Sequence, residues 1–250
     1  MFTHPLIPLQ PLVHINIILW ETRACFVWEY DCLGHLTSVH SLLLFVLMLV
    51  FNYSNLIDPL LSAIRDSVLD FADLTSEDRI LDICCGTGAQ VIRYGINGID
   101  AVGIDNDPNM LKTALKNQGK ARLTNISFQL ADATDLPFAD DYFTCSSIMF
   151  GLHDKDKPTQ GRLIGEMKRV VKSNGRFILV DFEVPLPVNK WGIFARTIEF
   201  LVGGSHYRGF KSYIKGGGLP VILKENNFQD IQNMLFAGGL IRVIKATIDN

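Results

Sequence analysis

A ten-residue stretch in the first half of the chain constrains the fold more than any other part of the sequence. Residues 79–88 read RILDICCGTG, a short apolar run that ends in Asp82 and passes into a turn with Gly86 and Gly88. A buried strand that ends in a glycine turn and gives way to a helix is how an open α/β sheet meets a nucleotide-sized ligand. The stretch therefore predicts an α/β domain that binds such a ligand.

The segments after this stretch alternate between the periods of strands and helices. Strands are expected at residues 99–105, 125–130, 143–150 and 176–182. Helices are expected at residues 56–71, from 89, from 108 and at 161–172. We expect Asp58 to cap the first helix, with Pro59 in its first turn, and Ser173-Asn174-Gly175 to end the last. Because the strands are almost continuously apolar, the pattern predicts a mostly parallel sheet with helices on both faces.

The C-terminal part of the chain changes character. Helices are expected at residues 191–202 and 213–225, and two apolar runs follow at 231–236 and 240–248. These runs are close enough to pair as an antiparallel hairpin across Ala237-Gly238-Gly239. Parallel sheets often carry such an edge, so we expect the hairpin to extend the sheet.

The first 51 residues differ from the rest, so we divide the chain into a hydrophobic extension at 1–51 and one domain at 52–250. Arg23 is the only basic residue before Arg65, and residues 42–51 are all apolar. A membrane-spanning helix needs about 20 mostly apolar residues, which this run reaches only by including polar ones. Three interpretations stay open: membrane association through residues 33–51, a packed or loosely ordered appendage, and a misplaced start codon.

Composition narrows the choice of partners and compartment. The net charge is -3 and no run of Lys and Arg exceeds two residues, so nothing indicates a nucleic-acid partner. The cysteines are odd in number and form no C-x-x-C pair, which predicts neither a disulfide framework nor a zinc site. They are Cys25, Cys32, Cys84, Cys85 and Cys145. We expect no bound metal and a cytoplasmic location, with membrane association as the open alternative.

The glycine turn also predicts the chemistry of the ligand. Gly86 and Gly88 let a ligand lie against the backbone, at the amide groups of the helix that follows. Asp105 ends the next strand, where a carboxylate can accept both ribose hydroxyls of an adenosine. A dinucleotide fingerprint requires a third glycine, but Val91 stands there. The carboxylate of Asp82 would instead suit a ligand with an ammonium or sulfonium group.

Three segments, taken in order, resemble the motifs of class I S-adenosylmethionine-dependent methyltransferases. Residues 82–88 are similar to the first motif, with Cys84 where many members have glycine. Asp105 resembles the acid that binds the ribose of the cofactor. Asp132, followed by residues 135–138, resembles the aspartate of the third motif, which meets the adenine amino group.

Two later segments resemble the ubiquinone/menaquinone C-methyltransferase branch of this family. They are residues 148–153 and 166–176, and the resemblance covers the chain from about Asn52 to its end. The chain departs from the branch at Thr144, where an aspartate is usual, and at Ser173-Asn174-Gly175, which replaces a lysine-proline-glycine turn.

The resemblance implies a Rossmann-like fold with a seven-stranded sheet. It also implies transfer of a methyl group from S-adenosylmethionine to a small, apolar or aromatic acceptor such as a quinone precursor. The residues implied to bind the cofactor are Asp82, Cys84, Gly86, Thr87, Gly88, Asp105, Asn106, Asp132, Ala133 and Met149.

The candidate residues on the acceptor side lie after the fourth strand and near the C-terminal end. His153 follows that strand at its carboxyl edge and is the candidate general base for a phenolic acceptor. Tyr207, Arg208 and Phe210 lie where family members place part of the acceptor pocket or its lid. The glycines at 216–218 are either a hinge or a simple loop.

Two other functions remain as alternatives. A catalytically silent protein of this fold would bind the cofactor without turning over an acceptor, so acceptor-dependent turnover separates it from an enzyme. A nicotinamide-dependent oxidoreductase is disfavoured by the missing third glycine. Among acceptors, a prenylated quinone precursor, an amine-bearing lipid and other small molecules stay open.

Overall fold

The computed structural model describes residues 53–248, which lie within one compact unit of the chain. The interpretations of the extension at 1–51 therefore lie outside the described residues, as do Cys25 and Cys32. Of the helices from Tyr53 onward, none is long and apolar enough to cross a lipid bilayer.

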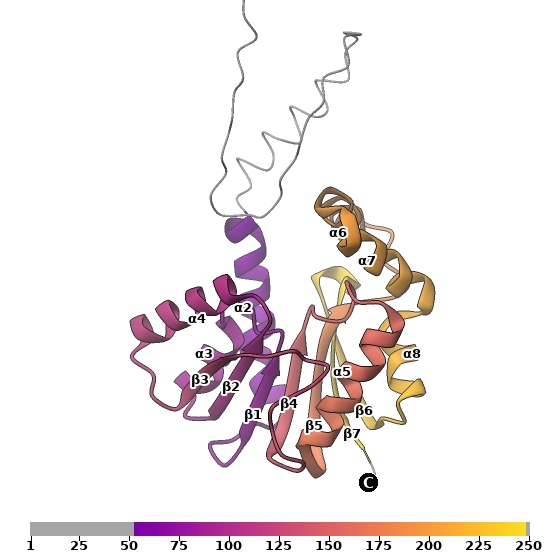
Figure 1. Ribbon diagram of the computed structural model, residues 1–250. Helices are drawn as coiled ribbons and strands as arrows, with labels where there is room; N and C mark the ends of the chain where they lie inside the picture. Colours follow the sequence, from indigo (N-terminus) through magenta and orange to yellow (C-terminus); the bar gives the residue numbers. More distant parts are fainter. Residues whose placement is uncertain (1–52, 249–250) are drawn as a thin grey trace, which may run out of the picture. The chain divides into compact units, whose positions relative to one another are not determined.

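A seven-stranded sheet organises this unit (Figure 1), in the order β3-β2-β1-β4-β5-β7-β6. Strands β1 to β5 are mutually parallel, and β7 runs antiparallel to both of its neighbours. The strands are β1 (Arg79–Ile83), β2 (Asp100–Asp105), β3 (Ile126–Leu130), β4 (Phe143–Met149), β5 (Val171–Phe182), β6 (Gln229–Phe236) and β7 (Ile241–Thr247). The predicted fold class is thus confirmed, and the chain order reverses between β1 and β4, where open α/β sheets bind ligands.

Helices cover both faces of the sheet (Figure 1). They are α2 (Tyr53–Phe71), α3 (Ala89–Ile96), α4 (Pro108–Ala121), α5 (Lys157–Val170), α6 (Lys190–Val202), α7 (Gly204–Gly216) and α8 (Gly218–Glu225). Neighbouring residues of β5 enter two different cores: Phe177 and Leu179 pack in one, and Ile178 and Val180 in the other. Successive side chains of a strand point to opposite faces, so the sheet is buried on both sides.

The first helix starts earlier than the sequence predicted. Helix α2 begins at Tyr53, so Asp58 does not cap it and Pro59 stands in its second turn. A proline there removes one intrahelical hydrogen bond, although its fixed φ is that of a helix. Burial of Ile64 and Val68 in the core outweighs this local cost.

The prediction for residues 161–175 was wrong at both ends. Helix α5 starts at Lys157, where the Asp156 side chain caps it by accepting from the Thr159 amide at 2.9 Å. Residues 173–175 do not end this helix, because they lie inside β5. The register of β5 against β4 shifts there, and Asn174 has a φ of +61°. A turn-like tripeptide therefore interrupts the pairing with β4 within a long strand.

The single helix expected at 213–225 is two helices. Helix α7 ends before Gly217 and α8 starts at Gly218, with φ values of +91° and +63° at these two glycines. Residues with side chains rarely adopt this conformation, so the glycines break the helix. Residues 206–211, for which the sequence predicted no helix, lie on α7, and the glycines at 216–218 form the break between two helices.

Candidate active site

The turn between β1 and α3 is built from residues in the left-handed region. Cys84, Gly86 and Gly88 have φ values of +56°, +54° and +77°. A Cβ on Gly88 would stand 2.5 Å from the Phe128 ring, whereas a Cβ on Gly86 would have no atom within 4 Å. Gly88 therefore allows the close packing of helix on strand, and Gly86 borders open space. Cys84 holds this conformation at a cost of about 1–2 kcal/mol.

Asp82 lies buried at the base of this turn. Its side chain is 2% exposed, and Ser147 Oγ donates a hydrogen bond to it at 2.5 Å. Burial raises the pKa of Asp82 to about 7. Gln90, in the first turn of α3, is also buried, and neither polar atom of its amide makes a hydrogen bond to residues 53–248. A ligand with a positive group would stabilise the ionised carboxylate of Asp82.

Asp105 links the glycine turn to the end of β2. Its Oδ2 accepts from the Gly86 amide and its Oδ1 from the Asp107 amide, both at 2.9 Å. Each carboxylate oxygen can accept a further hydrogen bond, so the group is oriented and still able to receive ribose hydroxyls. Asn106, the next residue, is exposed.

Asp132 lies two residues past β3, at the same edge of the sheet. Its Oδ1 accepts from the amide and the hydroxyl of Thr134, both at 2.8 Å, and these hydrogen bonds lower its pKa. Ala133 is half-buried against the core, and Thr87 is exposed in the glycine turn. Met149 ends β4, in register with Val180.

His153 is buried in the loop after β4 and is held by Asp181. Its Nδ1 lies 2.8 Å from Asp181 Oδ1, and the Leu152 and His153 amides donate to Asp181 Oδ2 at 3.2 and 3.1 Å. Burial lowers the pKa of His153, but the charge and hydrogen bond of Asp181, together with the charges of Glu199 and Asp154, outweigh burial, and the pKa is raised. Asp181 was missed from the sequence. A carboxylate inside the apolar run FILVDF was the available signal.

Helices α6 and α7 lie beyond the carboxyl ends of the parallel strands (Figure 1), and each brings one further polar side chain near His153. Glu199 on α6 lies between the histidines: its Oε1 is 3.8 Å from His153 Nε2 and its Oε2 is 2.8 Å from His206 Nε2. His206 Nδ1 lies 3.6 Å from Asp154 Oδ2. The carboxylates of Asp154 and Glu199 raise the pKa of His206 to about 9. Glu199 and His206 were not among the predicted site residues.

The predicted acceptor-side residues differ in whether they contact His153. Phe210 is buried, with its ring centroid 6.3 Å from that of His153. Tyr207 is half-buried and packs against Phe200 at a centroid distance of 5.6 Å. Arg208 is exposed. The structure thus brings Phe210 to His153, and Tyr207 and Arg208 lie on the same helix without a comparable contact.

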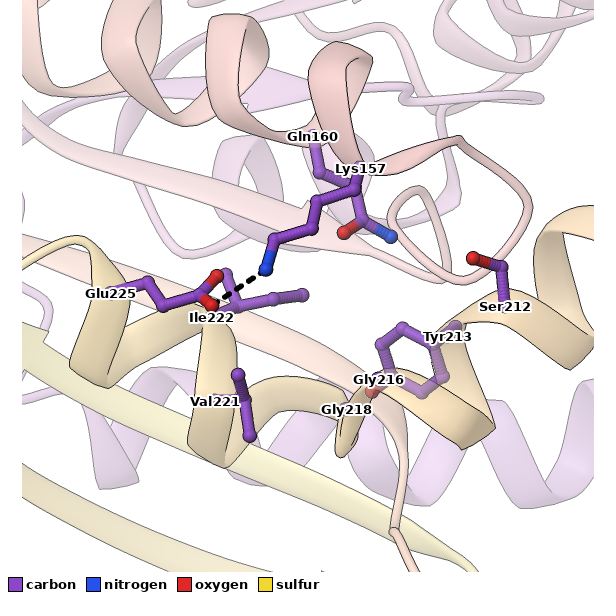
Figure 2. A pocket seen from close by; sticks show the side chains of 9 residues that line it. All are labelled: Lys157, Gln160, Ser212, Tyr213, Gly216, Gly218, Val221, Ile222 and Glu225. Carbon is purple, nitrogen blue, oxygen red and sulfur yellow. Dashed lines mark hydrogen bonds and ion pairs between the residues drawn. The ribbon is translucent and has the colours of Figure 1, made fainter.

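A small cavity lies between α5, α7 and α8 (Figure 2). Its volume is about 70 Å³, far below the roughly 300 Å³ or more of a small-molecule site. An ion pair between Lys157 Nζ and Glu225 Oε1, at 2.6 Å, crosses it (Figure 2). The cavity is therefore a packing gap and not the place for a nucleoside.

Comparison with known proteins decides the family. A family profile described as a methyltransferase domain matches residues 80–175. The chain is 32% identical over 195 residues to the ubiquinone/menaquinone biosynthesis C-methyltransferase UbiE of Proteus mirabilis. This alignment covers 71% of this chain and 76% of that protein. The chain belongs to the UbiE-type class I methyltransferases. S-Adenosylmethionine is the cofactor that this family implies.

Other relatives match a shorter part of this chain. The demethylmenaquinone methyltransferase of Paenarthrobacter aurescens is 38% identical over 122 residues, 49% of this chain and 46% of that protein. The chain thus spans about half the length of several curated relatives that it matches. A solved SAM-dependent methyltransferase from Aquifex aeolicus shares the fold, with a TM-score of 0.56 at 17% identity, over 73% of this chain and 88% of that one.

Proposed function

We propose that this UbiE-type methyltransferase transfers a methyl group from S-adenosylmethionine to a small, apolar or aromatic acceptor related to quinone precursors. The observation that carries the proposal is the buried carboxyl group of Asp82 beneath a glycine turn that borders open space. A cationic ligand above the turn would favour the ionised form of this group.

The cofactor, when bound, supplies an electrophilic methyl group on a sulfonium sulfur. On this chain we assign Asp82 to the positive end of the cofactor, Asp105 to its ribose and Asp132 to its adenine. The backbone and neighbours of these residues complete the site, namely Cys84, Gly86, Thr87, Gly88, Asn106, Ala133 and Met149. The main task of the residues is to hold the reactants at attack distance and exclude water.

An apolar acceptor is supported by the aromatic side chains around His153. The ring centroids of Phe182, Phe150, Phe210 and Tyr213 lie 5.0, 6.4, 6.3 and 6.4 Å from that of His153. The relatives named above are called demethylmenaquinone and ubiquinone/menaquinone methyltransferases, so a prenylated ring is the acceptor to test first. Tyr207, Arg208 and Phe210 would contribute to the same side of the site.

We assign His153 the task of activating the acceptor. A carboxylate oxygen only accepts hydrogen bonds, so Asp181 keeps the ring proton on Nδ1 and leaves Nε2 to take a proton. Removal of a phenolic proton makes the ring carbon nucleophilic. An apolar acceptor would also suit a cytoplasmic enzyme that associates with a membrane through residues 33–51.

Calorimetric titration of the full chain with S-adenosylhomocysteine tests the cofactor site. We expect binding that weakens about 10–100-fold in Asp105→Ala, from the loss of charged hydrogen bonds to the ribose. Asp100→Ala is the matched control, because Asp100 is exposed at the opposite end of the same strand. Binding of NADH instead would overturn the proposal. Cofactor binding without turnover of any prenylated ring would favour the catalytically silent alternative.

A further inference from the structure

Three side chains from different elements converge beside the sheet edge and offer metal ligands. His153 follows β4, Glu199 lies on α6 and His206 lies on α7. One ligand atom from each lies within 4.8 Å of those of the other two. Two imidazole nitrogens and one carboxylate form a donor set that suits divalent transition metals and leaves coordination positions open.

Glu199 is buried at the centre of this set. It is 5% exposed, its Oε2 forms an ion pair with His206 Nε2 at 2.8 Å, and its Oε1 lies 3.8 Å from His153 Nε2. Each of its two oxygens therefore faces one of the two histidine nitrogens. A buried carboxylate is normally paired or coordinates a metal.

Each histidine has a second carboxylate behind it. Asp181 Oδ1 lies 2.8 Å from Nδ1 of His153, and Asp154 Oδ2 lies 3.6 Å from Nδ1 of His206. Metal-bound histidines usually give the other ring N–H to a carboxylate, which sets the tautomer and the ring orientation. In both histidines the atom turned toward Glu199 is therefore Nε2, as a shared metal requires.

Close packing holds these elements in place. A Cβ on Gly209 would stand 2.2 Å from the Asp154 carbonyl oxygen, so α7 lies directly on the loop that carries His153. The rings of Phe182 and Phe210 flank His153 from β5 and α7. Such an apolar shell limits water and keeps the ligands oriented.

The charge of the cluster is compatible with a divalent cation. The carboxylates of Asp154, Asp181 and Glu199 carry three negative charges, and Lys155 offsets one through its 2.7 Å contact with Asp154. Protons on His153 and His206 can balance the other two in the metal-free protein, so a divalent ion would replace two protons without changing the net charge.

We propose that His153, Glu199 and His206 bind one divalent transition metal ion, of the zinc, iron(II) or cobalt(II) class. The nitrogen-rich donor set disfavours magnesium and calcium, which take oxygen ligands.

The role of the metal rests on the proposed function, although the site itself does not. The loop that carries His153 lies against the cofactor turn, since a Cβ on Gly151 would stand 3.0 Å from Cys84 Cβ. An acceptor hydroxyl in an open coordination position would release its proton to water more readily, as metal-bound water does. His153 Nε2 would hold the metal in that state, so the activation of the acceptor that we assign to His153 would then act through the metal it binds.

The test is a calorimetric titration of the full chain with Zn²⁺, after treatment with EDTA, at about pH 8, because metal ligands must lose their protons. We expect one Zn²⁺ per chain, with binding at least about 100-fold weaker in Glu199→Gln and His206→Asn. Glu225→Gln is the matched control on an exposed helix end, and His40→Asn controls for histidines outside the described residues. Both controls should bind as the unchanged chain does. Mg²⁺ should not compete.

A wild-type chain that binds no Zn²⁺ or Co²⁺, or variants that bind as well as the wild type, would overturn the metal site. Thermal melting and S-adenosylhomocysteine binding of each variant show that it is folded. The two proposals fail separately: retained cofactor binding without metal binding refutes only the metal site. Metal binding without cofactor binding refutes only the methyltransferase assignment.

Discussion

Replacing Asp82 by asparagine tests whether the buried carboxyl group is kept for function at a cost to stability. Burial raises the pKa of Asp82 from 3.8 to about 7. One pKa unit corresponds to about 1.4 kcal/mol, so the ionised group destabilises the ligand-free protein by up to about 4 kcal/mol.

The direction in which stability changes with pH follows from proton binding by Asp82. Because the pKa of Asp82 is higher in the folded than in the unfolded chain, the folded chain binds more protons between about pH 4 and pH 7. The stability linked to this group is complete below about pH 4 and is lost as the pH rises through about 7. Asparagine is neutral at every pH, and its oxygen can still accept from Ser147.

We expect Asp82→Asn to stabilise the ligand-free protein by about 2 kcal/mol at about pH 8, after about 1–3 kcal/mol is subtracted for its new buried donors. In thermal melts this corresponds to a Tm higher by about 4–8 °C. At about pH 4 Asp82 is already neutral, so the variant should gain no stability from the loss of a charge. It should be less stable than the unchanged protein by the cost of its buried amide donors. Binding of S-adenosylhomocysteine should weaken at least about tenfold.

The exposed Asp135→Asn is the control and should change neither property. An equal Tm change at both pH values would refute the reasoning, because ionisation would then not be its cause. Unchanged cofactor binding in Asp82→Asn would remove Asp82 from the site.

Three further substitutions separate packing from function. Gly88→Ala should cost about 3 kcal/mol in urea unfolding, because its Cβ would stand 2.5 Å from a phenylalanine ring. Gly86→Ala should cost only about 1–2 kcal/mol yet abolish most cofactor binding; equal stability losses in the two would contradict this contrast. Arg176→Met should cost about 3 kcal/mol at neutral pH, since it leaves the carboxylate of Asp78 buried without its ion-pair partner. The pKa of Asp78 is lowered despite its burial, so this loss should shrink as the pH falls below 3.8 in urea titrations.

The departure of this chain from its branch at Thr144 has a local structural reason. The Thr144 hydroxyl donates to Asp78 at 2.7 Å and accepts from the Arg79 amide at 3.0 Å. Thr144 thus helps hold the start of β1 against β4, at the end of the sheet opposite to the proposed cofactor site. The departure therefore does not affect the residues assigned to the cofactor.

Sequence patterns predicted the strands and most helices because their signals are local. The apolar run, the glycine turn and Asp82 are neighbours in the chain, and Asp105 follows from its place at the end of the next strand. Parallel strands bring their carboxyl ends to one edge, so these acids meet without further information. Errors arose at Pro59 and at residues 173–175, where contacts with the rest of the fold outweigh local preference.

The sequence by itself thus determined the order of the elements, the sheet and the residues of the proposed cofactor side. Only the tertiary structure decided the surroundings of His153. Asp181 stands 28 residues away from it, and Glu199 and His206 come from two helices beyond β5. No periodicity or spacing relates such distant positions, because their meeting depends on how α6 and α7 pack on the loop after β4.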